Sequence, residues 1–248
     1  MDPVIGVITS TFGTYWWIWL LTAVIAYLIG SVNPAVIVTK IWTKGKKDIR
    51  DMGSGNAGFT NVLRSVGKVP AIITIVCDAL KCVAAVLLGG LFFSLMLSNH
   101  YGTQDSVLNL QLVNLGKYIA GIFCILGHSF PLYFHFKGGK GVVSAAALML
   151  TEDWRVFLMV LATFLILFLI SKIISLGSIA GAVLYGPYTF IATFLFDRLV
   201  YGDNLPSIAY VVISTAAALI IGIFVTIKHK DNIGRLIRGE EKKIKAKK

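Results

Sequence analysis

A glycine-rich stretch between two apolar runs carries residue types that bind anions. Residues 53–64 read GSGNAGFTNVLR, and lysines and arginines flank them on both sides. Glycine tolerates positive φ, so such a backbone can turn its N–H groups inward as an anion-binding nest. Arginine can add two parallel hydrogen bonds to a phosphate. The residues that we predict to bind phosphate here are Gly53, Ser54, Gly55, Asn56, Thr60, Asn61 and Arg64, with Arg50 as a further candidate.

The alternative interpretation of this stretch is an ordinary polar turn that carries the positive charges of a cytoplasmic loop. Such a loop needs lysines and has no use for the sequence GSGN, so we favour the anion site. The stretch is not a Walker A loop, because no G-K-[ST] follows at the required spacing.

A second cluster, GHSFPLYFHFKGGKG at residues 127–141, repeats this chemistry directly before another apolar run. A helix that begins there would add the positive end of its dipole to the attraction for an anion. His128 could carry a proton or donate a hydrogen bond, and a purely structural role is the alternative. The residues that we expect to contact phosphate are Lys137, Gly138, Gly139 and Lys140.

A third cluster, KHKDNIGRLIRGEEKK at residues 228–243, follows the last apolar run. His229, Asn232 and Arg235 recur at intervals of three, so a helix would place them roughly on one face. A basic tail lying on anionic lipid is the alternative, and it explains Lys242 onward. It does not explain a histidine and an asparagine at this spacing.

The elements that must position these clusters are membrane helices. The 248 residues are 56% hydrophobic and only 14% charged, with a mean hydropathy of +0.80, and several apolar runs reach the ~20 residues that cross a bilayer. The sequence predicts an all-α, polytopic membrane protein with seven spans. The span at 142–154 is short, since 13 residues rise only ~20 Å, so we expect neighbouring helices to shield it. The expected spans are residues 15–39, 69–97, 115–134, 142–154, 156–174, 175–197 and 207–227.

The basic residues orient these spans. With the N-terminus outside and the C-terminus in the cytoplasm, the cytoplasmic segments hold 19 of the 23 lysines and arginines, as the positive-inside rule requires. The net charge of +11 is thus a property of membrane loops and does not predict nucleic-acid binding. We treat residues 1–248 as one domain whose cytoplasmic motif segments are 40–68, 127–144 and 228–243.

Two charged residues lie inside the second expected span. Asp78 and Lys81 are one helical turn apart, and charges at that depth are normally paired or functional. We favour an ion pair for Asp78 and leave Lys81 open as a contributor to the anion site. Ser31 and Ser175 end and begin their spans near the same membrane surface.

The remaining features of the spans predict packing. Gly177 and Gly181 form a G-x-x-x-G motif that favours close helix contact. Cys77, Cys82 and Cys124 lack zinc or redox spacing and are interpreted as small buried hydrophobes. No carboxylate or histidine cluster has the spacing of metal ligands, so no metal and no cofactor are expected.

These motifs together resemble the bacterial acyl-phosphate:glycerol-3-phosphate acyltransferases. The resemblance rests on DIRDMGSGNAGFTNVLRSVGK, the D-x-x-K pair, GHSFPLYFHFKGGKGVVS, SLGS and HKDNIGRLIRGEE, in this order along nearly the whole chain. It implies a bacterial inner-membrane enzyme with seven helices and a cytoplasmic active site. The family's substrate-site residues carry over as Ser54, Arg64, Lys140, Ser175, His229 and Asn232. The further candidates are Ser31, Arg50, Asp78, Lys81, His128, Arg235 and Glu241.

Some positions depart from the family pattern. The first motif reads GSVNPA, where members often have proline one position earlier and glycine in place of Ala35. Phe59 stands at a usually small position, and Val143 replaces a common alanine. These changes bear on the fine shape of the pocket, and none removes a predicted phosphate ligand.

The implied reaction moves a fatty acyl group from acyl phosphate to glycerol 3-phosphate, giving 1-acylglycerol 3-phosphate and inorganic phosphate. We expect direct attack by the glycerol hydroxyl, with Lys140 and Arg64 stabilising phosphate charge. Ser54 and Ser175 would donate hydrogen bonds. His229, backed by Asn232, would orient the acceptor or take its proton, unless a substrate phosphate does so. An acyl-serine intermediate is less favoured, because no serine has an evident His–Asp relay.

Two other functional classes are open to such a chain. A transporter of a phosphorylated solute would tend to hold its site near the midplane, often between inverted repeats, and no such repeat is visible. A non-catalytic anionic-lipid binder would need only the basic tail. The expected partners are acyl phosphate, glycerol 3-phosphate and membrane lipids, with no nucleic acid, and a monomer is compatible with the pattern.

Overall fold

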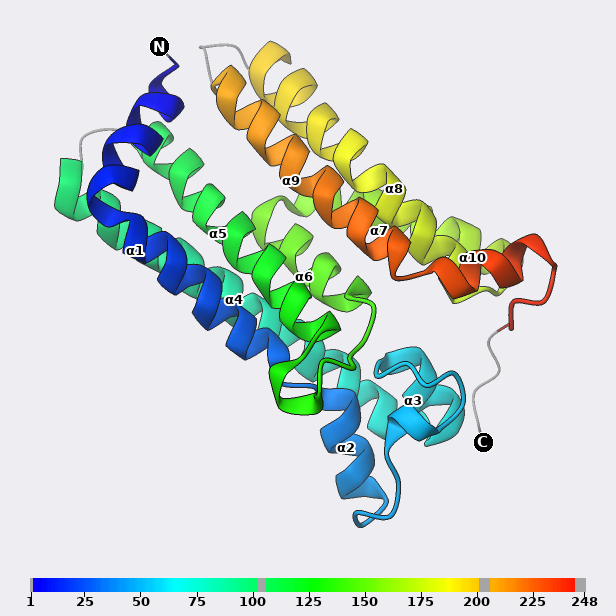
Figure 1. Ribbon diagram of the computed structural model, residues 1–248. Helices are drawn as coiled ribbons and strands as arrows, with labels where there is room; N and C mark the ends of the chain where they lie inside the picture. Colours follow the sequence, from blue (N-terminus) through cyan, green and yellow to red (C-terminus); the bar gives the residue numbers. More distant parts are fainter. Residues whose placement is uncertain (1, 102–105, 201–205, 244–248) are drawn as a thin grey trace.

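The computed structural model describes residues 2–101, 106–200 and 206–243, and the regular elements in these ranges are all helices (Figure 1). The first half contains α1 (Pro3–Ser31), α2 (Pro34–Trp42), η1 (Ile49–Asp51), α3 (Phe59–Ser65), α4 (Lys68–Tyr101) and α5 (Ser106–Ser129). The second half contains η2 (Leu132–Phe134), α6 (Val142–Glu152), α7 (Trp154–Ser171), α8 (Ile174–Phe190), the π-helical η3 (Ile191–Val200), α9 (Ile208–Ile227) and α10 (Lys230–Ile237).

Within these described residues, six helical segments are long and apolar enough to cross a membrane. They are Pro3–Trp42, Lys68–His100, Leu108–Phe134, Trp154–Ser171, Ile174–Val200 and Ile208–Ile227. The short apolar run near 142–154 forms α6, which has 11 residues and ends at Glu152. The expected all-helical architecture is therefore confirmed, and six of the seven expected spans overlap a helical segment long enough to cross a membrane.

The predicted bounds of the first span, 15–39, are wrong. Helix α1 begins at Pro3 and ends at Ser31, and a new helix begins at Pro34. A residue before proline is disfavoured in the α region, and Asn33 takes an extended conformation there and caps α2 by accepting from the Val36 N–H. The break leaves the Val32 carbonyl outside the helix ladder, and Lys81 Nζ donates to it at 2.6 Å.

The helices pack in two groups. Helices α1, α4 and α5 contact one another and α6 contacts α4 and α5, while α8 contacts both α7 and α9. Figure 1 shows the two groups side by side. Small residues allow the closest approaches: a Cβ on Gly30 would collide with the Cys124 carbonyl, and one on Gly127 with the Tyr27 carbonyl. This is the dense backbone packing typical of membrane helices. Cys82 and Cys124 are buried free thiols, as expected, whereas the free thiol of Cys77 is only partly buried.

The G-x-x-x-G motif packs α8 against α7. A Cβ on Gly177 would overlap Phe164, and one on Gly181 would press on Val160. The prediction of close helix packing at these two glycines is confirmed.

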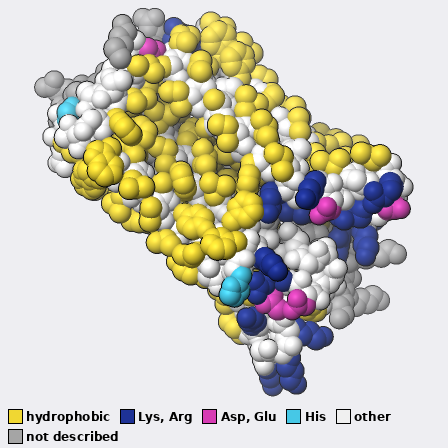
Figure 2. Space-filling view, viewed as in Figure 1, with side chains coloured by type: hydrophobic (Ala, Val, Ile, Leu, Met, Phe, Trp, Pro, Cys, Tyr) yellow, Lys and Arg dark blue, Asp and Glu magenta, His cyan; other side chains and the backbone are white. Residues whose placement is uncertain are grey.

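The molecule is polarised along the helix axes. Large hydrophobic side chains stay exposed along the spans, as lipid-facing residues do; Leu80, Leu87, Leu169 and Ile170 are examples. Figure 2 shows this apolar surface, with Lys and Arg side chains gathered toward the end that carries α2 and α10. The three motif segments all belong to this charged end.

Candidate active site

A large cavity opens at the charged end and continues between the helices. Its volume is about 890 Å³. Its polar part takes residues from the loop before α3, the turn before α6, the start of α8 and the start of α10. Sequence-distant segments thus share one pocket.

Asn61 shapes the first loop of this pocket. Its buried amide accepts from the Ser54 N–H at 3.1 Å and donates to the carbonyls of Ile49 at 3.1 Å and Met52 at 2.8 Å. Gly53 passes directly over this amide with φ +58, and a Cβ there would collide with the Asn61 Oδ1. The glycine is therefore needed both for its conformation and for the close approach, and together they fix Ser54 beside the cavity.

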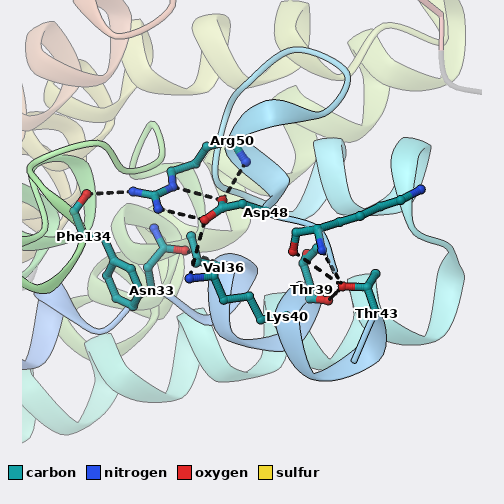
Figure 3. Close-up of polar contacts among 9 residues, drawn as sticks. Asn33, Val36, Thr39, Lys40, Thr43, Asp48, Arg50 and Phe134 are labelled. Atoms are coloured by element: carbon teal, nitrogen blue, oxygen red, sulfur yellow. Dashed lines mark hydrogen bonds and ion pairs between the residues drawn. The ribbon is translucent and has the colours of Figure 1, made fainter. Parts of the chain in front are cut away.

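Asp48 and Arg50 anchor the same loop to the turn after α5 (Figure 3). Arg50 pairs with the Asp48 carboxylate through two bonds of 3.0 and 2.8 Å and donates to the Phe134 carbonyl at 2.8 Å. The hydrogen bond from Arg50 lowers the pKa of Asp48, so the pair stays charged. Arg50 does not line the cavity, and its geometry is that of a loop anchor.

His128 packs against the loop that contains Gly138 and Gly139 and holds it in place. The Gly139 N–H donates to the His128 carbonyl at 3.1 Å, and a Cβ on Gly138 or Gly139 would collide with that histidine. His128 Nδ1 lies 3.1 Å from Asp78, which also pairs with Lys81 at 2.8 Å. The ion pair expected for Asp78 is present, and Lys81 turns to it and to the Val32 carbonyl, outside the cavity.

Lys140 connects this loop to α10 through a hydrogen bond. Its ammonium donates to the Asn232 side-chain carbonyl. Burial lowers the pKa of Lys140 to about 8, with the nearby Arg235 charge acting in the same direction. Nearby negative charges do not fully offset the cost of burying this ammonium, so an anionic ligand would stabilise its charged form.

Glu241 connects three of the predicted residues. Its carboxylate accepts from Ser175 Oγ at 2.8 Å, from Asn232 Nδ2 at 2.7 Å and from Arg235 Nε at 2.6 Å. Burial favours the neutral acid, but these hydrogen bonds outweigh it and lower the pKa of Glu241. The carboxylate thereby fastens the start of α8 to α10.

His229 lies between α9 and α10, directly before the first residue of α10. Its Nδ1 lies 2.7 Å from the Val225 carbonyl. A carbonyl only accepts hydrogen bonds, so Nδ1 is assigned the proton and Nε2 keeps its lone pair. Burial lowers the pKa of His229 to about 4, and the ring is therefore neutral at pH 7. A neutral imidazole with a free Nε2 at the cavity can accept a proton.

Four helices that begin at the cavity lack a side-chain N-cap. These are α3, α6, α8 and α10, whose cap positions are Gly58, Gly141, Ile173 and His229. By contrast, the side chains of Asp2, Asn33, Asp153 and Ser207 cap α1, α2, α7 and α9. Uncapped N–H groups and the positive ends of helix dipoles suit a phosphate.

The structure brings most of the predicted site residues together. Those that line the cavity are Ser54, Gly55, Asn56, Thr60, Asn61, Arg64, Asp78, His128, Gly138, Lys140, Ser175, His229, Asn232, Arg235 and Glu241. Those that do not are Ser31, Arg50, Gly53, Lys81, Lys137 and Gly139. Ser31 Oγ instead accepts from the Leu132 N–H at 3.2 Å, which is a structural contact between α1 and η2.

Sequence reasoning missed the deep half of the cavity. This part, the apolar slot, is lined by Met149, Phe157, Val160, Leu161, Phe164, Ala182, Tyr185 and Ile221. A signal for it exists in α8, where Ser175, Ser178, Ala182 and Tyr185 follow one another at helical spacing. No group of three or more histidine, cysteine, aspartate or glutamate residues in the described part of the chain could hold a metal ion.

Comparison with known proteins gives one consistent relationship. The sequence model of the family described as "Glycerol-3-phosphate acyltransferase" matches residues 20–239. A glycerol-3-phosphate acyltransferase of Paraburkholderia phymatum is 38% identical over 229 residues, which is 92% of this chain and 94% of that protein. One of Thermoanaerobacter pseudethanolicus is 35% identical over 225 residues, 91% and 95% of the two chains.

The fold is also similar to a solved structure. PlsY (YgiH), an integral membrane glycerol 3-phosphate acyltransferase, matches in its glycerol 3-phosphate form with a TM-score of 0.66 and 27% identity, over 92% of this chain and 96% of that one. Its lysophosphatidic acid form matches with a TM-score of 0.67.

Proposed function

The chain belongs to the glycerol-3-phosphate acyltransferase family, and we propose that its acyl donor is an acyl phosphate. The products are then 1-acylglycerol 3-phosphate, the first intermediate of phospholipid synthesis, and inorganic phosphate. The observation that carries this proposal is the two-part cavity: cations and uncapped helix ends at its mouth, and an apolar slot behind them. An acyl phosphate has the same two parts, and the mouth offers enough donors for two phosphate groups.

The charged mouth supports binding of both substrates' phosphates. Lys140 and Arg64 supply the positive charge, and Ser54 supplies a hydroxyl donor. The Ser175 hydroxyl also lines the cavity, but its proton goes to Glu241 at 2.8 Å, so Ser175 positions that carboxylate and does not donate to phosphate. Charge-assisted hydrogen bonds to phosphate are about twice as strong as neutral ones. Holding the acceptor hydroxyl beside the acyl carbonyl removes much of the entropic barrier.

The proposed step is a direct transfer. The glycerol hydroxyl oxygen attacks the acyl carbonyl carbon, the carbon–oxygen bond to phosphate breaks, and phosphate leaves with the bonding pair. The hydroxyl proton goes to His229 Nε2 or to a phosphate oxygen. Lys140 and Arg64 stabilise the negative charge on the leaving phosphate. His229, as a neutral base with a low pKa, is suited to orienting the hydroxyl and to accepting a proton late in the step.

We also propose seven crossings, with α6 as the short one between neighbouring helices, and an N-terminus outside. This orientation is supported by the 19 of 23 basic residues that the sequence assigns to the cytoplasmic segments, because lysines and arginines are retained on the cytoplasmic side. The mouth would then face the cytoplasm, the source of glycerol 3-phosphate.

The test uses the full chain purified in detergent, with palmitoyl phosphate and radiolabelled glycerol 3-phosphate. We expect equal amounts of 1-acylglycerol 3-phosphate and inorganic phosphate, formed only when both substrates are present. Palmitoyl-coenzyme A should give no product, and equal rates with it would refute the donor assignment. Uptake of glycerol 3-phosphate into proteoliposomes without acylation would favour the transporter instead.

A further inference from the structure

One face of α8 forms a continuous wall of the cavity from its mouth to its end. Ser175, Ser178 and Ala182 follow along this face, each small, and Tyr185 is the first large residue. Gly177 and Gly181 lie beside them. Only small side chains of α8 therefore line the cavity between Ser175 and Ala182. The aromatic ring of Tyr185 then blocks the path of an extended alkyl chain along this face.

Tyr185 is firmly held at this position. It is 1% exposed and belongs to the same buried cluster as Tyr118 and Ile221. Ile221 from α9 and Met149 from α6 line the same cavity and belong to the same buried cluster. The ring thus lies at the meeting point of α6, α8 and α9 and has little room to move aside.

A polar group of residues lies beyond this ring. Glu152 is close enough to Tyr185 to act on it electrostatically, and its carboxylate, with a side chain 2% exposed, lies 3.6 Å from Lys117 Nζ. Lys117 donates to Asn114 at 2.9 Å, and Asn114 donates to the Tyr210 hydroxyl at 3.2 Å. An alkyl chain pushed past Tyr185 would separate these buried polar groups without satisfying them, which is costly.

From these contacts we infer that Tyr185 sets the length of the acyl chain that the enzyme uses. This inference rests on the proposed function, because it assigns the acyl chain to the apolar slot. Ten residues separate Ser175 from Tyr185, which is ~15 Å along a helix. With carbon–carbon bonds of about 1.5 Å, an extended chain advances roughly 1.25 Å per carbon, so the slot holds about twelve carbons. Donors up to about that length are accepted whole, and longer ones must bend or leave a part outside.

The competing arrangement is an acyl chain that leaves the cavity sideways between α6 and α8 into the bilayer. Its terminal carbons would then contact lipid, and chain length would have little effect on the rate. The two arrangements differ in what lies next to the end of the chain.

The first experiment uses the reaction product, so it does not depend on the identity of the donor. A 1-acylglycerol 3-phosphate of about twelve carbons, carrying a diazirine at its terminal carbon, is bound to the full chain in detergent and photolysed. We expect the crosslink at Tyr185 and its neighbours Met149 and Ile221. Crosslinks confined to detergent, or to lipid-facing residues such as Leu169, would overturn the inference even if the acyltransferase assay succeeds.

The second experiment measures kcat/KM for saturated donors of about 8 to 18 carbons. The unmodified chain should prefer donors that fit the slot over the longest by about tenfold or more, the usual penalty for a group that a pocket excludes. Tyr185→Ala should remove this preference and Tyr185→Phe should keep it. Tyr188→Ala is the matched control, because Tyr188 lies on α8 outside the cavity and bonds to Thr163 at 2.9 Å.

An identical chain-length profile in the unmodified chain and in Tyr185→Ala would overturn the inference. Should Tyr185→Ala fail to fold, Ala182→Phe places a second aromatic ring one turn nearer the mouth, ~5 Å from Tyr185 along the helix. The optimal chain length should then shorten by about four carbons. Failure of every donor to give product, with the crosslink at Tyr185 intact, would count against the proposed donor and not against the length limit.

Discussion

The ammonium of Lys140 donates a hydrogen bond to the side chain of Asn232, which lies 92 residues further along the chain. This bond joins the turn before α6 to the first turn of α10. It brings a cation and an amide from two motifs to one point of the cavity, where Glu241 holds the amide from the other side.

Lys140→Ala should lower kcat/KM by about 10²–10³, the loss typical of removing one donor to a developing charge. Lys46→Ala is the matched control, since Lys46 is exposed and lies outside the cavity. Because the pKa of Lys140 is about 8, its ammonium is present below that pH. We expect kcat/KM of the unmodified chain to fall as pH rises through about 8, and the fall to disappear in Lys140→Arg. A fall that persists in Lys140→Arg would assign the titration to another group.

His229 should titrate far below an ordinary histidine. Burial lowers its pKa to about 4, and nuclear magnetic resonance of histidine labelled with nitrogen-15 should find a neutral Nδ1–H ring between pH 5 and 8. The signal is assigned by its loss in His229→Ala, which should also lower kcat by about 10²–10⁴. Titration near 6.5, or the Nε2–H tautomer, would contradict the orientation described here.

Glu241→Ala should lower both stability and activity. The substitution removes the acceptor of three hydrogen bonds, one of them from Arg235, and hydrogen bonds to charged groups contribute about 1.5–3 kcal/mol each without adding fully. We expect a loss of about 2–3 kcal/mol in the free energy of unfolding, measured as a lower Tm.

Glu240→Ala is the adjacent control. That carboxylate is exposed and pairs only with the exposed Arg238 among the described residues, so its removal should cost less than about 1 kcal/mol. Equal effects of the two substitutions would mean that Glu241 does not fasten α8 to α10.

Gly53→Ala should reduce turnover, because its Cβ collides with the Asn61 amide that places Ser54. Gly45 has a similar φ of +77 with open space around a Cβ. Both substitutions carry about 1–2 kcal/mol of backbone strain, but only Gly53→Ala also displaces the loop. The difference in kcat/KM between the two variants therefore reports the effect of the collision with the Asn61 amide. Equal kcat/KM values for Gly53→Ala and Gly45→Ala would show that the Asn61 amide can shift without cost.

The sequence predicted the polar residues of the site better than the apolar residues that line the rest of the cavity. Charged and polar residues in an apolar chain are conspicuous, and the positive-inside rule alone gathered three motifs on one surface, where the cavity now joins Ser54, Lys140 and His229. The small residues of α8 carry no comparable signal, since a glycine or alanine in a membrane helix indicates packing as readily as a binding wall. The apolar slot exists only through the packing of α6 to α9.

Residue type alone also did not distinguish residues that line the cavity from residues that hold its loops in place. Arg50 and Arg64 belong to the same motif, yet Arg50 is committed to Asp48 and the Phe134 carbonyl. The nearest sign of this in the sequence was Asp48 itself, two residues before the arginine, which offers a local partner. Likewise Lys81 was ambiguous until the break at Val32 created a carbonyl for it to bind.

The residues that follow α10 contact two other parts of the site. Arg64 donates to the Lys242 carbonyl at 3.0 Å, and the side chain of the preceding Glu241 holds Ser175. The guanidinium has five N–H donors, so Arg64 can bind a substrate phosphate while it keeps this bond, and its charge-assisted bonds to phosphate are the stronger ones. The segment between α10 and Lys242 therefore positions the Arg64 guanidinium at the cavity.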